Sequence, residues 1–169
     1  MAFIVESSTV ISFAEYADVV KRDSRLFDAN ESLTDDVVED HCIRATERIL
    51  SKLRSTAWWQ EYYIDRTSGV TFRTVADVPA LDVDRIIARQ NDFTDLCVYT
   101  ALGEFTLPSI ADFGDEDNSE RQKMGYYVNK AEELFQELVR AGDWYDFDND
   151  STIQSDEKSP GAINLRRVR

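Results

Sequence analysis

The sequence predicts a mainly α fold, a small bundle of about four helices followed by an extended C-terminal arm and tail. Apolar residues recur at steps of three and four in two long segments, 34–53 and 119–141. A Ser or Thr opens each of these segments, and the composition changes abruptly after Gly142. A chain of 169 residues is long enough to bury one core and has the size of a single domain.

The first two helices are predicted from the signals at their N-terminal ends. Ser12 and Glu15 have the spacing of a capping box, which predicts a short helix over 13–23. Residues 26–33 carry turn-forming side chains. Thr34 then suits an N-cap, because two acidic residues follow it at the positive end of the next helix dipole.

The second predicted helix is amphipathic and leads into an aromatic patch. Its inward face consists of Val38, Cys42, Ala45, Ile49 and Leu53. No stop signal follows before Asp65, so the helix is expected to continue to about Ile64. Residues 70–75 alternate and are rich in β-branched side chains, a pattern typical of a short β-strand or of an extended connection.

Two further helices complete the expected bundle. Pro79 favours the start of one of them, and Gly103 and Pro108 favour its end. Its apolar face comprises Val83, Ile86, Ile87, Phe93, Leu96, Cys97, Thr100 and Ala101. The last helix is expected over 119–141, ended by Gly142, with inward residues Met124, Tyr127, Val128, Ala131, Leu134, Phe135 and Leu138.

The chain divides at Gly142 into a helical domain, residues 1–142, and an arm and tail, residues 143–169. Residues 143–157 hold six acids and no Lys or Arg, whereas residues 161–169 hold three Arg and no acid. The sequence Ser159-Pro160-Gly161 separates the two pieces and excludes a regular helix across them. We expect this part of the chain to lie outside the core.

The ratio of acidic to basic residues indicates which classes of partner the chain can bind. The chain has 33 Asp and Glu against 19 Lys and Arg, which gives a formal net charge of -14. Proteins that wrap nucleic acid or bind anionic lipid by charge need clustered cations, so protein partners are favoured. The opening segment lacks the basic start of a secretory signal, and no apolar run reaches the roughly 18 residues of a membrane span.

Few residues are candidates for catalysis. His41 is the only His, and the adjacent Cys42 points about 100° away on a helix, so the two do not face each other. Cys42 and Cys97 lack metal-ligand spacing and are expected to be reduced thiols in the core. The sequence contains no Gly-rich phosphate loop and no nucleophile elbow. We therefore expect no enzymatic activity.

Residues 146–157 resemble a calcium-binding EF-hand loop. Acids stand at loop positions one, three and five, and a Glu stands at position twelve, where such loops place a bidentate ligand. Ser151 replaces the usual Gly at position six, and a Ser-Pro-Gly sequence stands where the exit helix should begin. The alternative is a solvated acidic arm that needs no cofactor. The candidate calcium ligands are Asp146, Asp148, Asp150, Thr152 and Glu157.

Two segments are candidates for partner contacts. An aromatic patch lacks the basic groove of a base-stacking platform, and we expect it to be partly core and partly protein interface. Its residues are Trp58, Trp59, Tyr62 and Tyr63. The end of the chain suits strand addition or an acidic groove on a partner, with a disordered solubilising end as the alternative. Its candidate residues are Ile163, Leu165, Arg166, Arg167, Val168 and Arg169.

The order of these features resembles the small helical adaptor proteins of tailed-bacteriophage necks, also called head-tail connector or head-completion proteins. The resemblance covers residues 10–147 and contains no catalytic fingerprint. It implies a structural virion protein that forms a ring, of about twelve copies, beneath the portal and joins the capsid to the tail. It rests on the closing amphipathic helix and on the sequences Ser12-Phe13-Ala14-Glu15, Leu33-Thr34-Asp35-Asp36-Val37-Val38-Glu39 and Val78-Pro79-Ala80-Leu81.

The resemblance also implies partners and a location. The partners are further copies of this chain, the portal protein and the next neck or tail protein, with no membrane. The location is the virion neck, after assembly in the host cytoplasm. Members of the family commonly bind the portal through their C-terminal segment, which here implicates residues 163–169.

In such a ring the negative charge of the chain would act on the DNA. DNA would pass through the lumen unbound, because acidic subunits repel its phosphates. Two other functions stay open. One is an acidic DNA mimic that inhibits a nucleic-acid enzyme, and the other is a calcium-binding interaction module.

Overall fold

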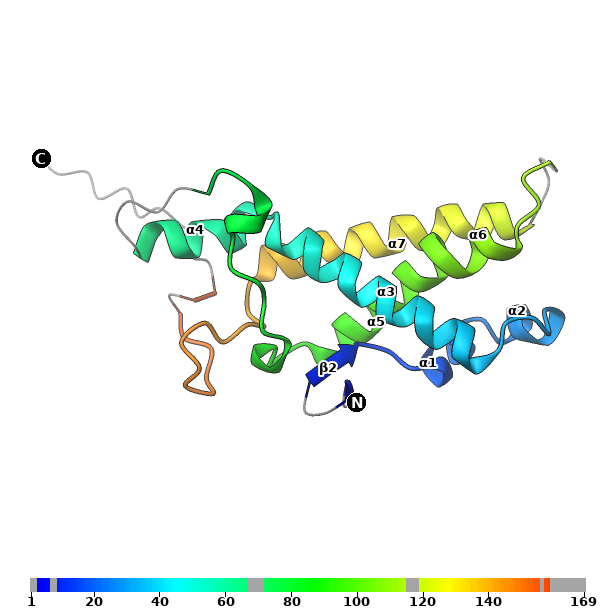
Figure 1. Ribbon diagram of the computed structural model, residues 1–169, viewed down its shortest axis with the longest axis horizontal. Helices are drawn as coiled ribbons and strands as arrows, with labels where there is room; N and C mark the ends of the chain where they lie inside the picture. Colours follow the sequence, from blue (N-terminus) through cyan, green and yellow to red (C-terminus); the bar gives the residue numbers. More distant parts are fainter. Residues whose placement is uncertain (1–2, 7–8, 67–71, 115–118, 156, 159–169) are drawn as a thin grey trace, which may run out of the picture.

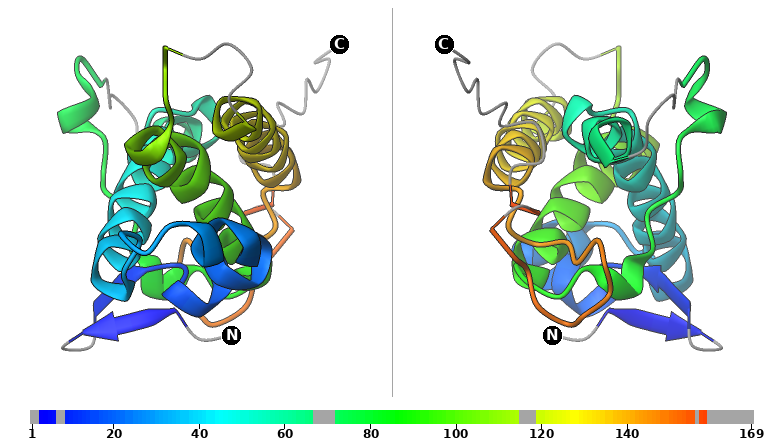
Figure 2. Two further views of the ribbon diagram at one scale, coloured as in Figure 1. Left: turned by 90° about the vertical axis from the view of Figure 1, so that its right-hand side faces the viewer. Right: turned by 90° about the vertical axis from the view of Figure 1, so that its left-hand side faces the viewer.

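The computed structural model describes residues 3–6, 9–66, 72–114, 119–155 and 157–158. They form an elongated, mainly helical bundle, as the sequence predicts (Figure 1). Its body consists of α3 (Asp35–Arg54), α5 (Gln90–Thr100) and α7 (Ser119–Ala141). Helix α5 lies between α3 and α7 and packs against both (Figure 2).

The N-terminal part differs from the prediction. Strands β1 (Ile4–Glu6) and β2 (Thr9–Ser12) pair as an antiparallel hairpin. The first helix, α1 (Tyr16–Arg22), begins later than expected, because Glu15 and not Ser12 is its N-cap. The buried Ser12 hydroxyl instead donates to the carbonyl oxygen of Ala14 at 2.6 Å.

The next segments confirm one prediction and correct two. Helix α2 (Ser24–Ala29) occupies much of the segment expected to be a turn. The predicted inward face of α3 is confirmed, since all five of its side chains are buried. The helix nevertheless ends before the aromatic patch, and α4 (Ala57–Arg66) begins separately. At the junction the Thr56 hydroxyl donates to the Leu53 carbonyl oxygen at 2.6 Å, in competition with helical backbone bonding.

The described β structure is the N-terminal hairpin, and residues 72–75, the described part of the predicted β element, form no strand. Residues 70–71 lie outside the described chain, and the residues after them bend into η1 (Val75–Asp77). The Asp77 carboxylate accepts hydrogen bonds from the backbone N–H groups of Arg73 and Thr74, at 3.2 and 2.9 Å. These bonds favour a turn over an extended strand.

The third predicted helix both begins and ends later than expected. After η2 (Val83–Arg85), α5 runs through a π-helical segment, η3 (Ala101–Thr106), into α6 (Leu107–Ile110). Pro108 does not end the helix, because it lies in the first turn of α6, where Pro is tolerated. Gly103 allows η3 to approach α7 closely, since a Cβ there would lie 3.0 Å from the backbone nitrogen of Val128.

The last helix has the predicted bounds. Tyr127, Phe135 and Leu138 of α7 are buried, whereas Val128, expected to face inward, is 42% exposed. Gly142 follows with a φ of 56°, the left-handed conformation that commonly ends a helix. None of the helices in the described residues has the length and apolar character needed to cross a membrane.

Candidate functional site

Residues 143–158, here called the arm, fold back against one end of the bundle. The Asp146 N–H donates to the Arg85 carbonyl oxygen at 3.0 Å, and the Ile87 N–H donates to the Trp144 carbonyl oxygen at 3.1 Å. Trp144, Tyr145 and Phe147 are buried. The prediction that this part lies outside the core is therefore wrong. The acidic composition of this segment favoured a solvated arm. The aromatic residues that directly follow the helix were the sequence signal that the arm is buried.

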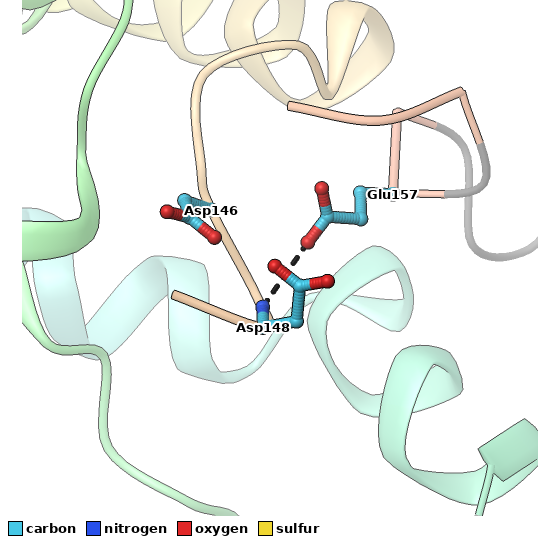
Figure 3. Close-up of side chains that lie close together, drawn as sticks. All are labelled: Asp146, Asp148 and Glu157. Carbon is cyan, nitrogen blue, oxygen red and sulfur yellow. Dashed lines mark hydrogen bonds between the residues drawn. The ribbon is translucent and has the colours of Figure 1, made fainter. Parts of the chain in front are cut away.

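Three of the five predicted calcium ligands converge in the arm. The carboxylates of Asp146, Asp148 and Glu157 each have an oxygen within 4.8 Å of the others (Figure 3). Asp146 is 1% exposed and Glu157 is 2% exposed, whereas Asp148 is exposed to solvent. Burying a carboxylate without hydrogen-bond donors costs free energy. The hydrogen bonds of Asp146 and Glu157 therefore determine whether the loop is stable.

Backbone N–H groups compensate the buried carboxylate of Asp146. Its Oδ1 accepts from Asn149 at 2.6 Å and from Asp150 at 3.3 Å, and its Oδ2 accepts from Ser151 at 2.8 Å. The first half of the loop thus curls around this one side chain. Hydrogen bonds to a charged carboxylate are stronger than neutral ones, so they fix the position of the group.

Glu157 joins the end of the loop to its beginning. Its Oε1 accepts from the N–H groups of Phe147 at 2.7 Å and Asp148 at 3.2 Å, the latter bond drawn in Figure 3. Its Oε2 accepts from the N–H of Gln154 at 2.8 Å. A residue eleven positions after Asp146 is thereby brought beside it, as an EF-hand loop requires.

The backbone makes the sharp turn of such a loop without glycine. Ser151, at position six, has a φ of 69°, and Asn149 has a φ of 64°. Asn adopts this left-handed conformation more readily than most residues, whereas Ser does so at a cost of about 1–2 kcal/mol. The absence of Gly at position six therefore does not prevent the turn.

The other two predicted ligands, Asp150 and Thr152, are hydrogen-bonded to each other. Asp150 Oδ1 accepts from the Thr152 N–H at 2.8 Å and from the Thr152 hydroxyl at 2.6 Å, and hydrogen bonds from Thr152 lower the pKa of Asp150. Partial desolvation raises the pKa of Asp148, with further contributions from the charges of Asp150 and Glu157. A cation would relieve this repulsion, and an all-oxygen ligand set suits calcium.

The predicted aromatic patch lies against the arm. Trp59 is fully buried, Trp58 is 8% exposed, and Tyr62 and Tyr63 are half-buried. The ring of Phe147 stacks on that of Tyr62, with centroids 3.6 Å apart and planes 16° apart. The sequence indicated that part of this patch lies in the core, but not which residues do so, nor that the arm packs against them.

The remaining reactive side chains make structural contacts. His41 is 8% exposed, and its Nδ1 lies 3.1 Å from the hydroxyl of Thr106 in η3. Cys42 and Cys97 are both buried, and the Cys97 thiol donates to the Cys42 carbonyl oxygen at 3.4 Å. A hydrogen bond with the Cys97 thiol, together with burial, raises the pKa of Cys42. The Cys42 thiol therefore stays protonated and unreactive at neutral pH.

The burial of His41 predicts a pH dependence of stability. Burial lowers its pKa, with a smaller opposing contribution from Asp40, so the unfolded chain takes up the proton first as the pH falls. The free energy of unfolding should decrease below about pH 6.5, by at most about 1.4 kcal/mol per pH unit. Urea unfolding between pH 7.5 and 5.5 measures this slope. His41→Gln should flatten it, and an equal slope in both proteins would contradict the assignment.

The predicted partner-binding residues 163–169 lie outside the described residues. The site that the structure presents is therefore the arm, with its acidic loop on one side and its aromatic contacts to α4 on the other. Comparisons with family models, with curated proteins and with solved structures found no match to this chain.

Proposed function

We propose that this chain is a non-enzymatic structural adaptor of the head-tail connector kind, which forms a ring beneath a phage portal and joins the capsid to the tail. The observation that carries the proposal is the order of the helices. Helix α1, the long helix α3, the segment from Val78 into α5 and the closing helix α7 occur in the order that the resemblance implies, with α2 between α1 and α3 and with α4 after α3. The arm then begins at the end of α7.

The internal contacts of the reactive residues support a non-enzymatic role. His41 and Cys97, the residues that catalysis would most readily use, are hydrogen-bonded inside the bundle. Burial is the main cause of the lowered pKa of His41. Function then resides in surfaces that bind other proteins, where large aromatic and arginine side chains dominate affinity.

The net charge supports a position beside DNA without a tight contact to it. A ring of subunits with a formal charge of -14 each would present a repulsive wall to phosphates, so the genome could slide through. Exposed acids gather in the first turn of α3, at Asp35 and Asp36, and continue along its surface at Glu39 and Asp40. These residues are candidates for the channel side of the ring.

A genetic experiment tests the adaptor proposal. A stop codon early in this reading frame, in a phage that encodes it, should yield DNA-filled heads and complete tails that fail to join. Electron microscopy of the lysate distinguishes these from whole virions, and supplying the chain from a plasmid should restore joining. Joined virions in the absence of the chain would refute the proposal.

No described contact favours the DNA-mimic alternative. A mimic needs a row of free carboxylates spaced like phosphates, whereas several carboxylates on α5 and α7 are paired with cations. Glu132 lies 2.8 Å from Lys52, Glu133 lies 2.7 Å from Lys130, and Asp95 lies 2.8 Å from Arg22. These ion pairs interrupt any phosphate-like row of carboxylates on α5 and α7.

Calcium binding is a second candidate function, and one specific observation favours it. Asp146, Asp148 and Glu157 place three carboxylates together although residues 148 and 157 are nine positions apart. Calcium needs six or more oxygen ligands, so backbone carbonyl oxygens and water would complete the set. This function is compatible with the first, because a bound ion would brace the arm of an adaptor.

A further inference from the structure

Helix α4 has little capacity to remain folded by itself. It contains 10 residues, and isolated helices shorter than about 12–15 residues are marginal in water. A short junction, Ser55–Thr56, separates it from α3. Figure 1 shows α4 projecting at the end of the molecule from which α7 passes into the arm. Its stability must therefore come from tertiary packing.

The arm supplies this packing. The ring of Phe147 lies 3.6 Å from that of Tyr62 and 5.3 Å from those of both Trp58 and Trp59. Trp144 and Tyr145 add contacts of 4.7 Å to Trp58 and 4.9 Å to Trp59. Within the described residues, the ring contacts between α4 and other segments all involve the arm.

The base of the arm is anchored independently of α4. Trp144 packs on Phe93 of α5, with centroids 4.8 Å apart, and its Nε1 donates to the Leu138 carbonyl oxygen at 2.9 Å. The three body helices bury their own apolar faces against one another, for example at Ile49, Leu96 and Leu138. Losing the contacts beyond Trp144 therefore leaves the packing of the body intact.

We infer that the arm is a strap that holds α4 on the bundle, so that α4 and residues 145–158 are ordered or released together while α3, α5 and α7 stay folded. Release would uncover the aromatic face of α4, formed by Trp58, Trp59, Tyr62 and Tyr63. The ring packing that forms the strap is present without a bound cation, so its test is separate from those of the calcium proposal and of the adaptor role.

Amide hydrogen exchange of the full chain tests the strap. In Phe147→Ala, peptides covering 57–66 should exchange at least about tenfold faster, because local opening sets their protection. Peptides from α3, α5 and α7 should keep their rates within about twofold. The matched control is Phe113→Ala, since Phe113 is 61% exposed, and this variant should leave α4 unchanged.

A second variant tests the same coupling from the other side. Tyr62→Ala should accelerate exchange in residues 145–155, because coupling between two elements is reciprocal. Unchanged exchange of α4 in Phe147→Ala would overturn the inference, and so would an equal loss of protection across the body helices. If Phe147→Ala does not fold, Tyr62→Ala alone decides: faster exchange confined to α4 and the arm supports the strap, and any other pattern refutes it.

Discussion

Gly142→Ala is expected to detach the end of the arm and lower the free energy of unfolding by about 2–4 kcal/mol. Gly142 has a φ of 56°, and a side chain in this left-handed conformation costs about 1–2 kcal/mol. A Cβ at this position would also overlap the backbone carbonyl oxygen of Lys158 and lie 2.7 Å from Nε1 of Trp58. The backbone oxygen cannot rotate away, so the last residue of the arm must move.

Gly125→Ala is the matched control for this effect. Gly125 lies within α7, and a Cβ there has no atom within 4 Å. Ala should therefore stabilise the helix, by about 0.5–1 kcal/mol. Urea unfolding compares the two variants. Tryptophan emission reports locally, because all three Trp residues, Trp58, Trp59 and Trp144, lie where α4 and the arm meet. Equal shifts of the same sign in both variants would contradict the close contact.

Calcium is expected to bind the arm loop with a dissociation constant below about 1 mM. Asp146→Asn and Glu157→Gln keep the shape of the side chains and a hydrogen-bond acceptor but remove a charge, so each should abolish measurable binding. Binding should raise stability by about 2.7 kcal/mol when free calcium is a hundredfold above the dissociation constant. Because protonated carboxylates do not bind calcium, the affinity should decrease as the pH is lowered. Partial desolvation raises the pKa of Asp148, which adds to this loss.

Isothermal titration calorimetry with calcium chloride measures this binding directly. Asp28→Asn is the charge-matched control, since Asp28 is exposed on α2 and lies outside the acidic cluster. It should bind calcium as the parent chain does. Absence of heat in the parent at several millimolar calcium would remove the calcium function, as would equal binding by Asp146→Asn.

The body helices could be predicted because their signals are local and repeated. In α3 and α7 the apolar period of three to four residues extends over five or more turns. Gly142 has the left-handed conformation expected of a Gly directly after a helix. The inward positions of α3 are all buried, whereas one of α7, Val128, is exposed. Packing against Gly103 of η3 places Val128 at the edge of the contact, which periodicity alone does not reveal.

The errors in the fold arise where tertiary contacts override local signals. Ser12 has capping-box spacing, but its neighbour Phe13 donates its N–H to the Thr46 hydroxyl of α3 at 3.0 Å, which keeps this segment extended. Pro108 is a helix breaker in most contexts, yet here it falls in the first turn of a new segment after a π-helical stretch. Thr46 is 33 positions from Phe13, so no local pattern reveals this contact.

The candidate site was predictable in part. The spacing of Asp146, Asp148 and Glu157 matches that of calcium-binding loops, so it can be recognised in the sequence. The packing of Phe147 on Tyr62 joins residues 85 positions apart, and no local pattern encodes such a pair. The acidic composition of the arm also favoured the wrong expectation, that it would be solvated.

The most direct measurement of the adaptor role is the mass of a portal ring after it is mixed with this chain. Purified portal rings from a phage that encodes the chain should gain mass in whole multiples of the chain mass, as measured by mass photometry. A variant that ends at Lys158 should fail to bind, because it lacks residues 163–169. Portal rings that keep their mass at chain concentrations of tens of micromolar would contradict the proposed function.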